Sequence, residues 1–230
     1  MPRQFALALS SLALLFLLST AAKADPLVVN AVTQGWYTST GTNNGVSPTN
    51  NYFVGAGSGE VFRNYFVFDL TYITGVTSAQ LRIYRPGDST LNSDPSETYV
   101  LYAVQNPALP GTQEGVSIYD DLGSGPVYAE ITLATPPSYG ESILIIDLNA
   151  EALAAIQSSG GLFAIGGAIT TLRSPTVARG HEGLFSGSGG QTAQLLVEGQ
   201  ALPTPEPATM LLLGTGLAGV AAKVRRRRKD

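Results

Sequence analysis

Short stretches in which apolar and polar residues alternate with a period of two constrain this chain more than any other feature. Residues 61–70 read VFRNYFVFDL, which places Phe66 and Phe68 on one face of an extended chain and Tyr65 on the other. Residues 78–85, SAQLRIYR, alternate in the same way. Successive side chains of a β-strand point to opposite faces, so this alternation predicts strands with one buried face.

Such stretches recur along the chain, separated by clusters of Gly, Pro, Asn, Asp and Ser, which favour turns. Further examples are ETYVLYAV, VYAEITL, SILIIDL, GLFAIGG and TAQLLVEG. Short strands at this spacing predict an all-β fold, an antiparallel β-sandwich. One short helix is expected in AEALAAIQSS, where Asn149 can cap the first turn and Glu151 suits the helix dipole. Gly160 or Gly161 can end it.

Residues 25–200 are predicted to form a single domain. Its end is placed near residues 199–205, where strand-like sequence gives way to a Pro-rich linker. A body of about 180 residues can bury a core of its own without covalent staples. The chain has no cysteine, which excludes disulfides and thiol chemistry.

Residues 1–24 have the features of a secretory signal peptide. An early arginine precedes an apolar run, and Ala22 and Ala24 form the A-x-A pattern that signal peptidase cleaves. The mature protein is therefore expected to begin at Asp25. An uncleaved membrane anchor is the alternative, but the apolar run is short for a membrane span.

The other end of the chain carries a second apolar segment, residues 208–222, followed by a basic cluster. A helix of this length would reach about 22 Å, whereas a bilayer core needs about 30 Å. Basic residues resist translocation, so the cluster would stay cytoplasmic and leave the preceding domain outside. The residues of this cytoplasmic stop are Arg225, Arg226, Arg227, Arg228 and Lys229.

Pro205, Glu206 and Pro207, followed by the apolar segment and the arginine cluster, resemble a PEP-CTERM sorting signal. The resemblance implies recognition and cleavage near the motif by an exosortase, a membrane-embedded thiol transpeptidase-like enzyme. It also implies a Gram-negative host that makes exopolysaccharide. The sorting signal would span residues 201–230 and comprise a linker, an apolar helix and the basic tail. Its helix would insert transiently into the inner membrane, and the protein would finally lie at the cell surface or outside the cell. A plain C-terminal anchor behind a Pro-rich linker is the alternative.

Without its two ends the chain is strongly acidic. Residues 25–206 contain 16 Asp and Glu, five Arg and no Lys, a formal charge of −11. A negative surface of this kind argues against nucleic acid and anionic membranes as partners. Divalent cations and neutral glycans are compatible with it, and solubility alone would also account for it.

The body has a second resemblance. Phe68-Asp69-Leu70 and the pattern from Ala79 to Tyr84 are similar to the DNRLRE-type domain, a jelly-roll module of secreted bacterial proteins. Residues 142–167 and 185–199 resemble that family's strand, short helix, strand and closing strand, although Asn30 stands where Asp is common. The likeness implies a jelly-roll-like β-sandwich and, because some relatives bind polysaccharides, a glycan role.

Catalytic residues are not indicated. His181 is the sole histidine and Ser186 or Ser188 follows it closely, but no G-x-S-x-G motif occurs and zinc would need more His or Cys ligands. Turn and cap chemistry account for Asp120, Asp121 and Asp147. The chain is therefore predicted to be a noncatalytic surface or matrix protein. A polysaccharide-active hydrolase or lyase is the alternative.

The loops and exposed faces offer residues for two kinds of ligand contact. Asn43, Asn44, Asn50 and Asn51 could offer oxygen ligands to a structural calcium ion, but no Ca²⁺-loop motif is present and ordinary turns are favoured, so no cofactor is expected. Glycan contact would use aromatic faces beside polar groups. The candidates for it are Trp36, Tyr37, Tyr65, Tyr84 and Arg63, with exopolysaccharide as the partner.

Overall fold

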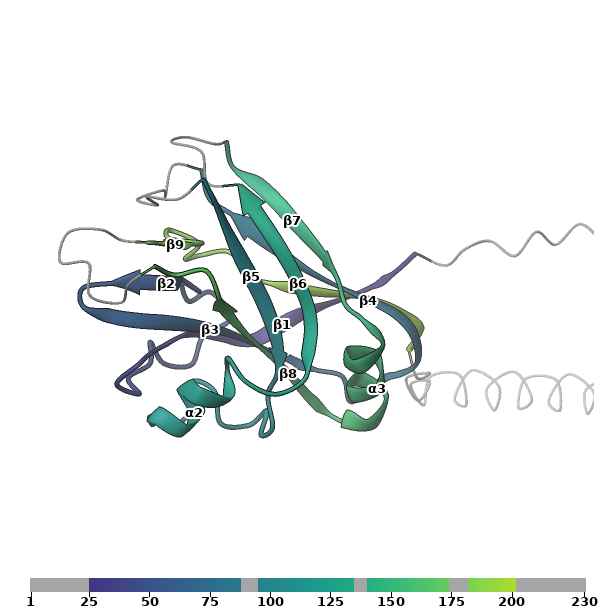
Figure 1. Ribbon diagram of the computed structural model, residues 1–230. Coiled ribbons are helices and arrows are strands. Elements are labelled where there is room, and N and C mark those ends of the chain that lie inside the picture. The colour runs from purple at the N-terminus through teal and green to yellow at the C-terminus, as the bar shows by residue number, and fades with distance from the viewer. Residues whose placement is uncertain (1–24, 88–94, 135–139, 174–181, 202–230) are drawn as a thin grey trace, which may run out of the picture.

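The computed structural model describes residues 25–87, 95–134, 140–173 and 182–201 as ten strands and two helices (Figure 1). The strands are β1 (Leu27–Thr38), β2 (Val54–Gly57), β3 (Glu60–Asp69), β4 (Ile73–Arg85), β5 (Ser96–Ala103), β6 (Val127–Ala134), β7 (Ser142–Asp147), β8 (Leu162–Ile169), β9 (Glu182–Leu184) and β10 (Gln194–Ala201). The helices are α2 (Val116–Asp121) and α3 (Ala150–Ser159). The pairings between the strands are antiparallel.

The strands form one folded sheet in the order β6-β5-β8-β3-β1-β10-β4-β7, with β2 paired to β3 and β9 paired to β2. The fold turns at β1. Its residues 27–30 pair with β10, whereas residues 31–38 pair with β3. The register with β3 shifts between Ala31 and Thr33. A bulge that bends a strand in this way lets it serve two layers. The first layer is thus the start of β1 with β10, β4 and β7; the second is the rest of β1 with β3, β8, β5 and β6.

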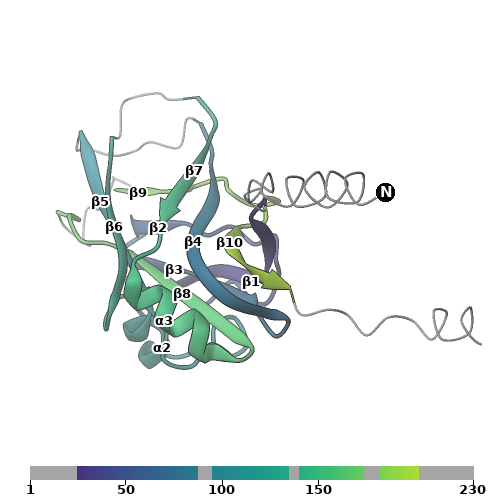
Figure 2. The ribbon, with the colours of Figure 1, turned by 90° about the vertical axis from the view of Figure 1, so that its right-hand side faces the viewer.

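The two layers enclose the main core, and the sheet curls until its margins, β6 and β7, come close beside α3 (Figure 2). Phe66 and Phe68 from β3 meet Leu81 and Ile83 from β4 there, all fully buried or nearly so. These are the side chains that the period-two alternation directs inward. The predicted antiparallel β-sandwich is confirmed, in a nearly barrel-like form.

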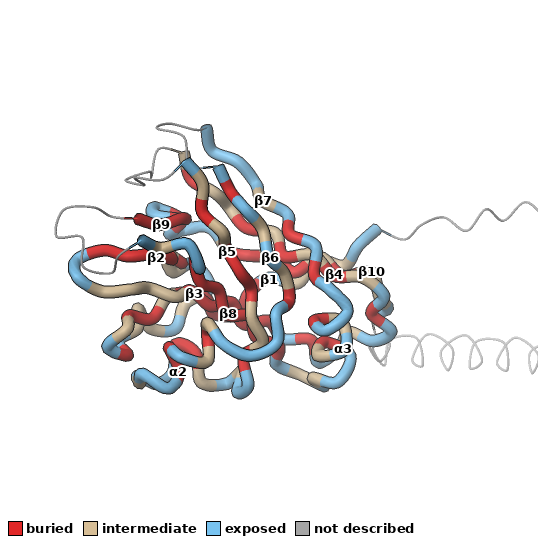
Figure 3. Tube along the Cα trace, in the orientation of Figure 1, coloured by how far each residue is buried: buried red, intermediate tan, exposed pale blue. Residues whose placement is uncertain are grey.

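A second apolar cluster covers the outer face of the second layer. Tyr65 and Val67, which alternate with the inward phenylalanines of β3, pack there against Ile118 and Leu122. Buried residues consequently line both faces of β3 (Figure 3). The close approach requires glycine at position 166, where a Cβ would lie 2.6 Å from the backbone of Leu122.

The helix predicted after Asn149 is confirmed as α3. The Asn149 side chain accepts a hydrogen bond from the Ala152 amide at 3.1 Å, and Gly160 ends the helix in the left-handed conformation. Ala152 and Ile156 face the main core, so α3 closes one end of the sandwich. The sequence predicts Asp120 and Asp121 in a turn. This prediction is wrong, because both residues belong to the helix α2.

Neither α2 nor α3, the helices among the described residues, has the length and apolar character needed to cross a membrane. The predicted signal peptide, His181, the sorting motif and the basic cluster lie outside the described residues.

Candidate functional site

The five residues predicted for glycan contact do not gather at one site. Tyr37 and Tyr65 have exposed fractions of 0% and belong to the second apolar cluster, with their rings 5.7 Å apart. The expectation that they present a free aromatic face is therefore wrong, because α2 and the segment before it cover them. Trp36 lies on the opposite face of β1 from Tyr37 and packs edge-on against Phe62.

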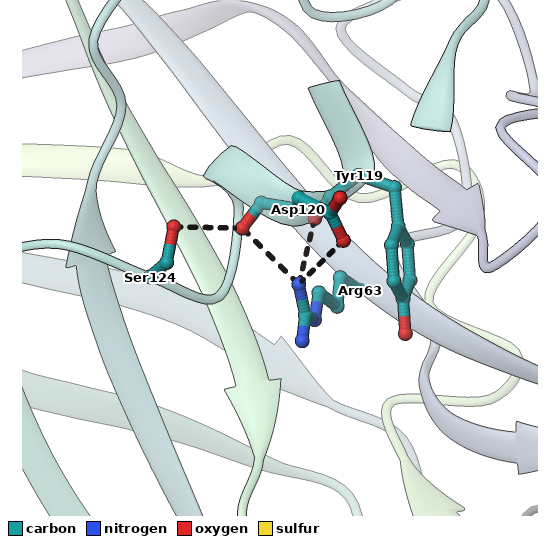
Figure 4. Close-up of polar contacts among 4 residues, drawn as sticks. All are labelled: Arg63, Tyr119, Asp120 and Ser124. Carbon is teal, nitrogen blue, oxygen red and sulfur yellow. Dashed lines mark hydrogen bonds and ion pairs between the residues drawn. The ribbon is translucent and has the colours of Figure 1, made fainter. Parts of the chain in front are cut away.

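Arg63 holds α2 against the sheet. Its Nη1 donates hydrogen bonds to the carbonyl oxygens of Tyr119 at 2.9 Å and Asp120 at 3.2 Å, and its guanidinium lies 4.2 Å from the centre of the Tyr119 ring (Figure 4). Ser124 Oγ donates to the same Asp120 carbonyl. Carbonyls at the end of a helix favour a cation, so Arg63 closes α2 and fastens it to β3.

We expect Arg63→Met to lower the free energy of unfolding by about 2 kcal/mol, because it removes two charged hydrogen bonds and the cation–π contact but keeps an apolar stem. Thermal and urea unfolding measure the change. Arg82→Met, a matched loss of one arginine on the first layer, should cost under about 1 kcal/mol. Equal effects of the two substitutions would contradict a docking role for Arg63.

A hollow of about 400 Å³ lies beside α2, between Gln105, Ser117 and Asp121. Asp121 Oδ2 accepts a hydrogen bond from the Gln105 amide at 2.9 Å, while burial raises the pKa of its carboxyl group. Asp120 lies 4.0 Å from Arg63 Nη1. Both neighbouring carboxylates therefore have local partners that join α2 to its surroundings.

The Asn-rich loop uses its amide groups to hold itself together. The side-chain oxygens of Asn43, Asn44 and Asn51 accept hydrogen bonds from the backbone amides of Gly45, Trp36 and Phe53. Each of these three oxygens therefore has a partner in the backbone of the same region. In the described part of the chain, no group of three or more His, Cys, Asp or Glu is arranged to hold a metal.

Tyr84 lies in a different setting, on the open face of the first layer. A hollow of about 330 Å³, called here the Tyr84 cavity, is lined by Arg82, Tyr84, Ile143, Gln191, Thr192 and Gln194, among others. The lining combines a partly exposed aromatic ring, a cation, two carboxamides and a hydroxyl group. Of the residues predicted for glycan contact, Tyr84 thus lines a hollow together with such groups.

A chain of side-chain hydrogen bonds fixes Arg82 at this cavity. Gln194 Nε2 donates to Asn30 Oδ1 at 2.9 Å, and Gln194 Oε1 accepts from Arg82 Nη1. The chain runs across β1, β10 and β4, where Asn30, Gln194 and Arg82 are directly paired. The orientation of Arg82 is thus set by two neighbouring strands.

The backbone of Tyr84 is fixed by Tyr52, a buried side chain of the main core. The Tyr52 hydroxyl donates to the Tyr84 carbonyl at 2.9 Å and accepts from the Tyr84 amide at 3.1 Å, so it satisfies both backbone groups beyond the last pair of β10 with β4. Burial raises the pKa of Tyr52, which therefore remains a neutral donor. A hydrogen bond to Glu141 raises the pKa of Tyr84.

The rim of the cavity is held by Gln34, a fully buried side chain of β1. Its Nε2 donates to the carbonyls of Asn50 at 2.8 Å and Gln191 at 2.6 Å, and its Oε1 accepts from the Ala193 amide at 2.8 Å. Sequence reasoning missed both Gln34 and Tyr52. Their partners are distant in the chain, and neither residue interrupts a recognisable pattern.

The C-terminal segment is the part of the chain that matches a known family. Residues 203–228 match the PEP-CTERM protein-sorting motif, as the resemblance predicted. No curated protein matches the chain. Among solved structures, the chain is similar to the K1 cleaved adhesin domain of Lys-gingipain from Porphyromonas gingivalis W83, at 15% identity and a TM-score of 0.32, covering 77% of this chain and 99% of that one. A likeness at this level says nothing about function.

The matched segment covers only the tail, so no family is assigned to the β-sandwich, and its similarity to the DNRLRE-type domain stays a prediction. The motif itself implies export and sorting by an exosortase, which makes this chain a surface or extracellular protein.

Proposed function

We propose that the protein is a noncatalytic component of the cell surface or extracellular matrix that associates with exopolysaccharide through the Tyr84 cavity. The observation that carries the proposal is the cavity's lining, in which a tyrosine ring lies beside Arg82, Gln191 and Gln194. An apolar ring face with a few placed hydrogen-bonding groups suits a sugar, which has both apolar C–H faces and many hydroxyl groups.

The support behind this lining favours binding by a preformed surface. Tyr52 fixes the backbone of Tyr84, Gln34 fixes the backbone of Gln191, and Gln194 fixes Arg82. Groups already held in place lose less conformational entropy when a ligand binds. The formal charge of −11 on residues 25–206 suits a neutral glycan better than a polyanion.

The tail completes the proposal. Signal peptidase removes residues 1–24, the apolar segment enters the inner membrane transiently with its arginines on the cytoplasmic side, and an exosortase then cleaves near Glu206. The noncatalytic part rests on the sequence, which has one histidine, no cysteine and no nucleophile motif. No observation favours a hydrolase or lyase over this reading.

The test is retention of the exported protein on an affinity gel that carries the host's own exopolysaccharide. We expect Tyr84→Ala to weaken binding about tenfold, which corresponds to about 1.4 kcal/mol. Tyr72→Ala is the matched control, because Tyr72 is 72% exposed and lies just before the far end of β4.

Equal retention of the wild type and Tyr84→Ala would remove the cavity from the proposal. Release of shortened glycan by the wild type would instead identify the protein as an enzyme. Glycan size is therefore measured in the same experiment.

A further inference from the structure

The strand β7 forms an open margin of the first layer. It pairs with β4 along its whole length, and the order of the described strands ends with it. The other margin, β6, meets the chain leaving β7 at one end, where the Asn149 amide donates to the Tyr128 carbonyl at 3.0 Å. Figure 2 shows the two strands diverging from that end.

The open edge of β7 offers an ordered set of backbone groups. The Leu148 amide donates to the Ala79 carbonyl on β4 at 3.0 Å. In an antiparallel strand, the N–H and C=O of one residue point to the same side and alternate with those of the next. Leu144 and Ile146 therefore face β4, whereas Ile143 and Ile145 direct their N–H and C=O groups outward.

The side chains beside these groups are apolar and uncharged. Ile143 is 48% exposed and Ile145 is 52% exposed, and residues 142–146 contain neither charge nor proline. Natural edge strands are usually protected by lysine, proline or a bulge. β7 pairs with β4 without a register shift, and residues 25–206 have no lysine. The charge of β7 lies at its end, at the exposed Asp147, whereas the edge of β6 carries the exposed Glu130 in its middle.

We infer that two copies of this protein join through antiparallel pairing of β7 with the partner's β7, about a two-fold axis at Leu144. In this register Ile143 lies opposite the partner's Ile145, and Ile145 lies opposite the partner's Ile143. Each of these pairs exchanges two backbone hydrogen bonds, because both residues direct their groups outward. Moving the axis to Ile145 or Ile143 would place an isoleucine opposite Asp147 or Glu141.

A second copy is the occupant that the edge itself favours, because in the Leu144-centred register its two outward isoleucines lie opposite each other across the two-fold axis. Two bodies of formal charge −11 repel each other, so they can approach only along a neutral segment. The strand that docks must also present apolar side chains at its two outward positions. β7 itself meets both conditions. In the Leu144-centred register Glu141 lies opposite the partner's Asp147 at each end, so association should strengthen as salt screens this repulsion.

The pairing would join two Tyr84 cavities on one continuous sheet. Tyr84 is paired with Ile143 and Arg82 with Ile145. A row would therefore run from Tyr84 through Ile143 and the partner's Ile145 to the partner's Arg82. The two β4 strands would be about 14 Å apart, three strand spacings. A gain in glycan avidity rests on the proposed function, whereas the pairing does not.

Sedimentation of the exported protein without glycan tests the inference at low salt and at about 0.5 M salt. At the higher salt the Debye length falls to about 4 Å, so the repulsion between the two copies is largely screened. We expect a dimer whose share rises with protein concentration and with salt. Ile145→Lys should remove it, whereas Val46→Lys, at a loop residue that is 61% exposed, should leave it intact. Unfolding curves confirm that both variants fold. A monomer at all concentrations, or equal dimer formation by Ile145→Lys, overturns the inference.

Cross-linking tests the register, since the chain has no cysteine of its own. Opposite residues of a hydrogen-bonded pair have Cα atoms about 5.5 Å apart, within disulfide range, whereas Ile143 and the partner's Ile143 would be about 9 Å apart. A mixture of Ile143→Cys and Ile145→Cys should therefore form at least about fivefold more covalent dimer than either variant alone. Equal cross-linking in all three samples would refute this register.

Discussion

Gln34→Leu should lower the free energy of unfolding by about 3 kcal/mol, because leucine fills a similar volume but leaves three backbone groups, one buried and two partly buried, without this partner. These groups are the carbonyls of Asn50 and Gln191 and the amide of Ala193. In a domain of this size the loss corresponds to about 6–12 °C in melting temperature. The same substitution should weaken glycan retention, because Gln191 and Thr192 line the Tyr84 cavity.

Gln80→Leu is the matched control. Gln80 lies on the open face of β4 and donates a single hydrogen bond to Asp147 Oδ1 at 2.6 Å. Its replacement should change stability by less than about 1 kcal/mol and leave retention as it is. Urea unfolding and affinity chromatography of both variants give the comparison. A loss below about 1 kcal/mol for Gln34→Leu would mean that the two loops are held by other contacts.

Local patterns predicted the parts of the fold that depend on local chemistry. The alternation in β3 and β4 placed Phe66, Phe68, Leu81 and Ile83 in the core, since the pleat alone decides which face each side chain takes. The cap at Asn149 was predictable for the same reason, because its hydrogen bond joins residues three apart.

Long-range packing decided the features that the sequence did not reveal. Tyr65 was assigned correctly to the face opposite the phenylalanines, but that face is covered by α2 and is not open to ligands. The helix itself is six residues long and has no side-chain cap, so it leaves almost no local signal. Gln34 and Gln191 are 157 positions apart and meet only because β1 serves both layers.

Glu206→Ala should block maturation of the tail without changing the stability of the folded domain. Residue 206 lies within the segment that matches the sorting motif, which spans residues 203–228. The sequence predicts a linker here, and substitutions in a linker usually change stability by less than about 0.5 kcal/mol. If a processing enzyme reads Pro205, Glu206 and Pro207, the variant should fold normally and yet fail to be cleaved.

The two readings of the tail differ in where the protein is found. A plain anchor tolerates Glu206→Ala, because its apolar segment and its arginines are unchanged and they alone would hold it in the membrane. A sorting signal does not, and the uncleaved precursor should then accumulate in the inner membrane of a host that has an exosortase. Intact mass and membrane fractionation of the wild type and the variant distinguish these outcomes.

Thr204→Ala, two positions away in the same linker, is the matched control and should be processed like the wild type. If Glu206→Ala and the wild type are processed alike, the glutamate is not read and the tail acts as an ordinary anchor.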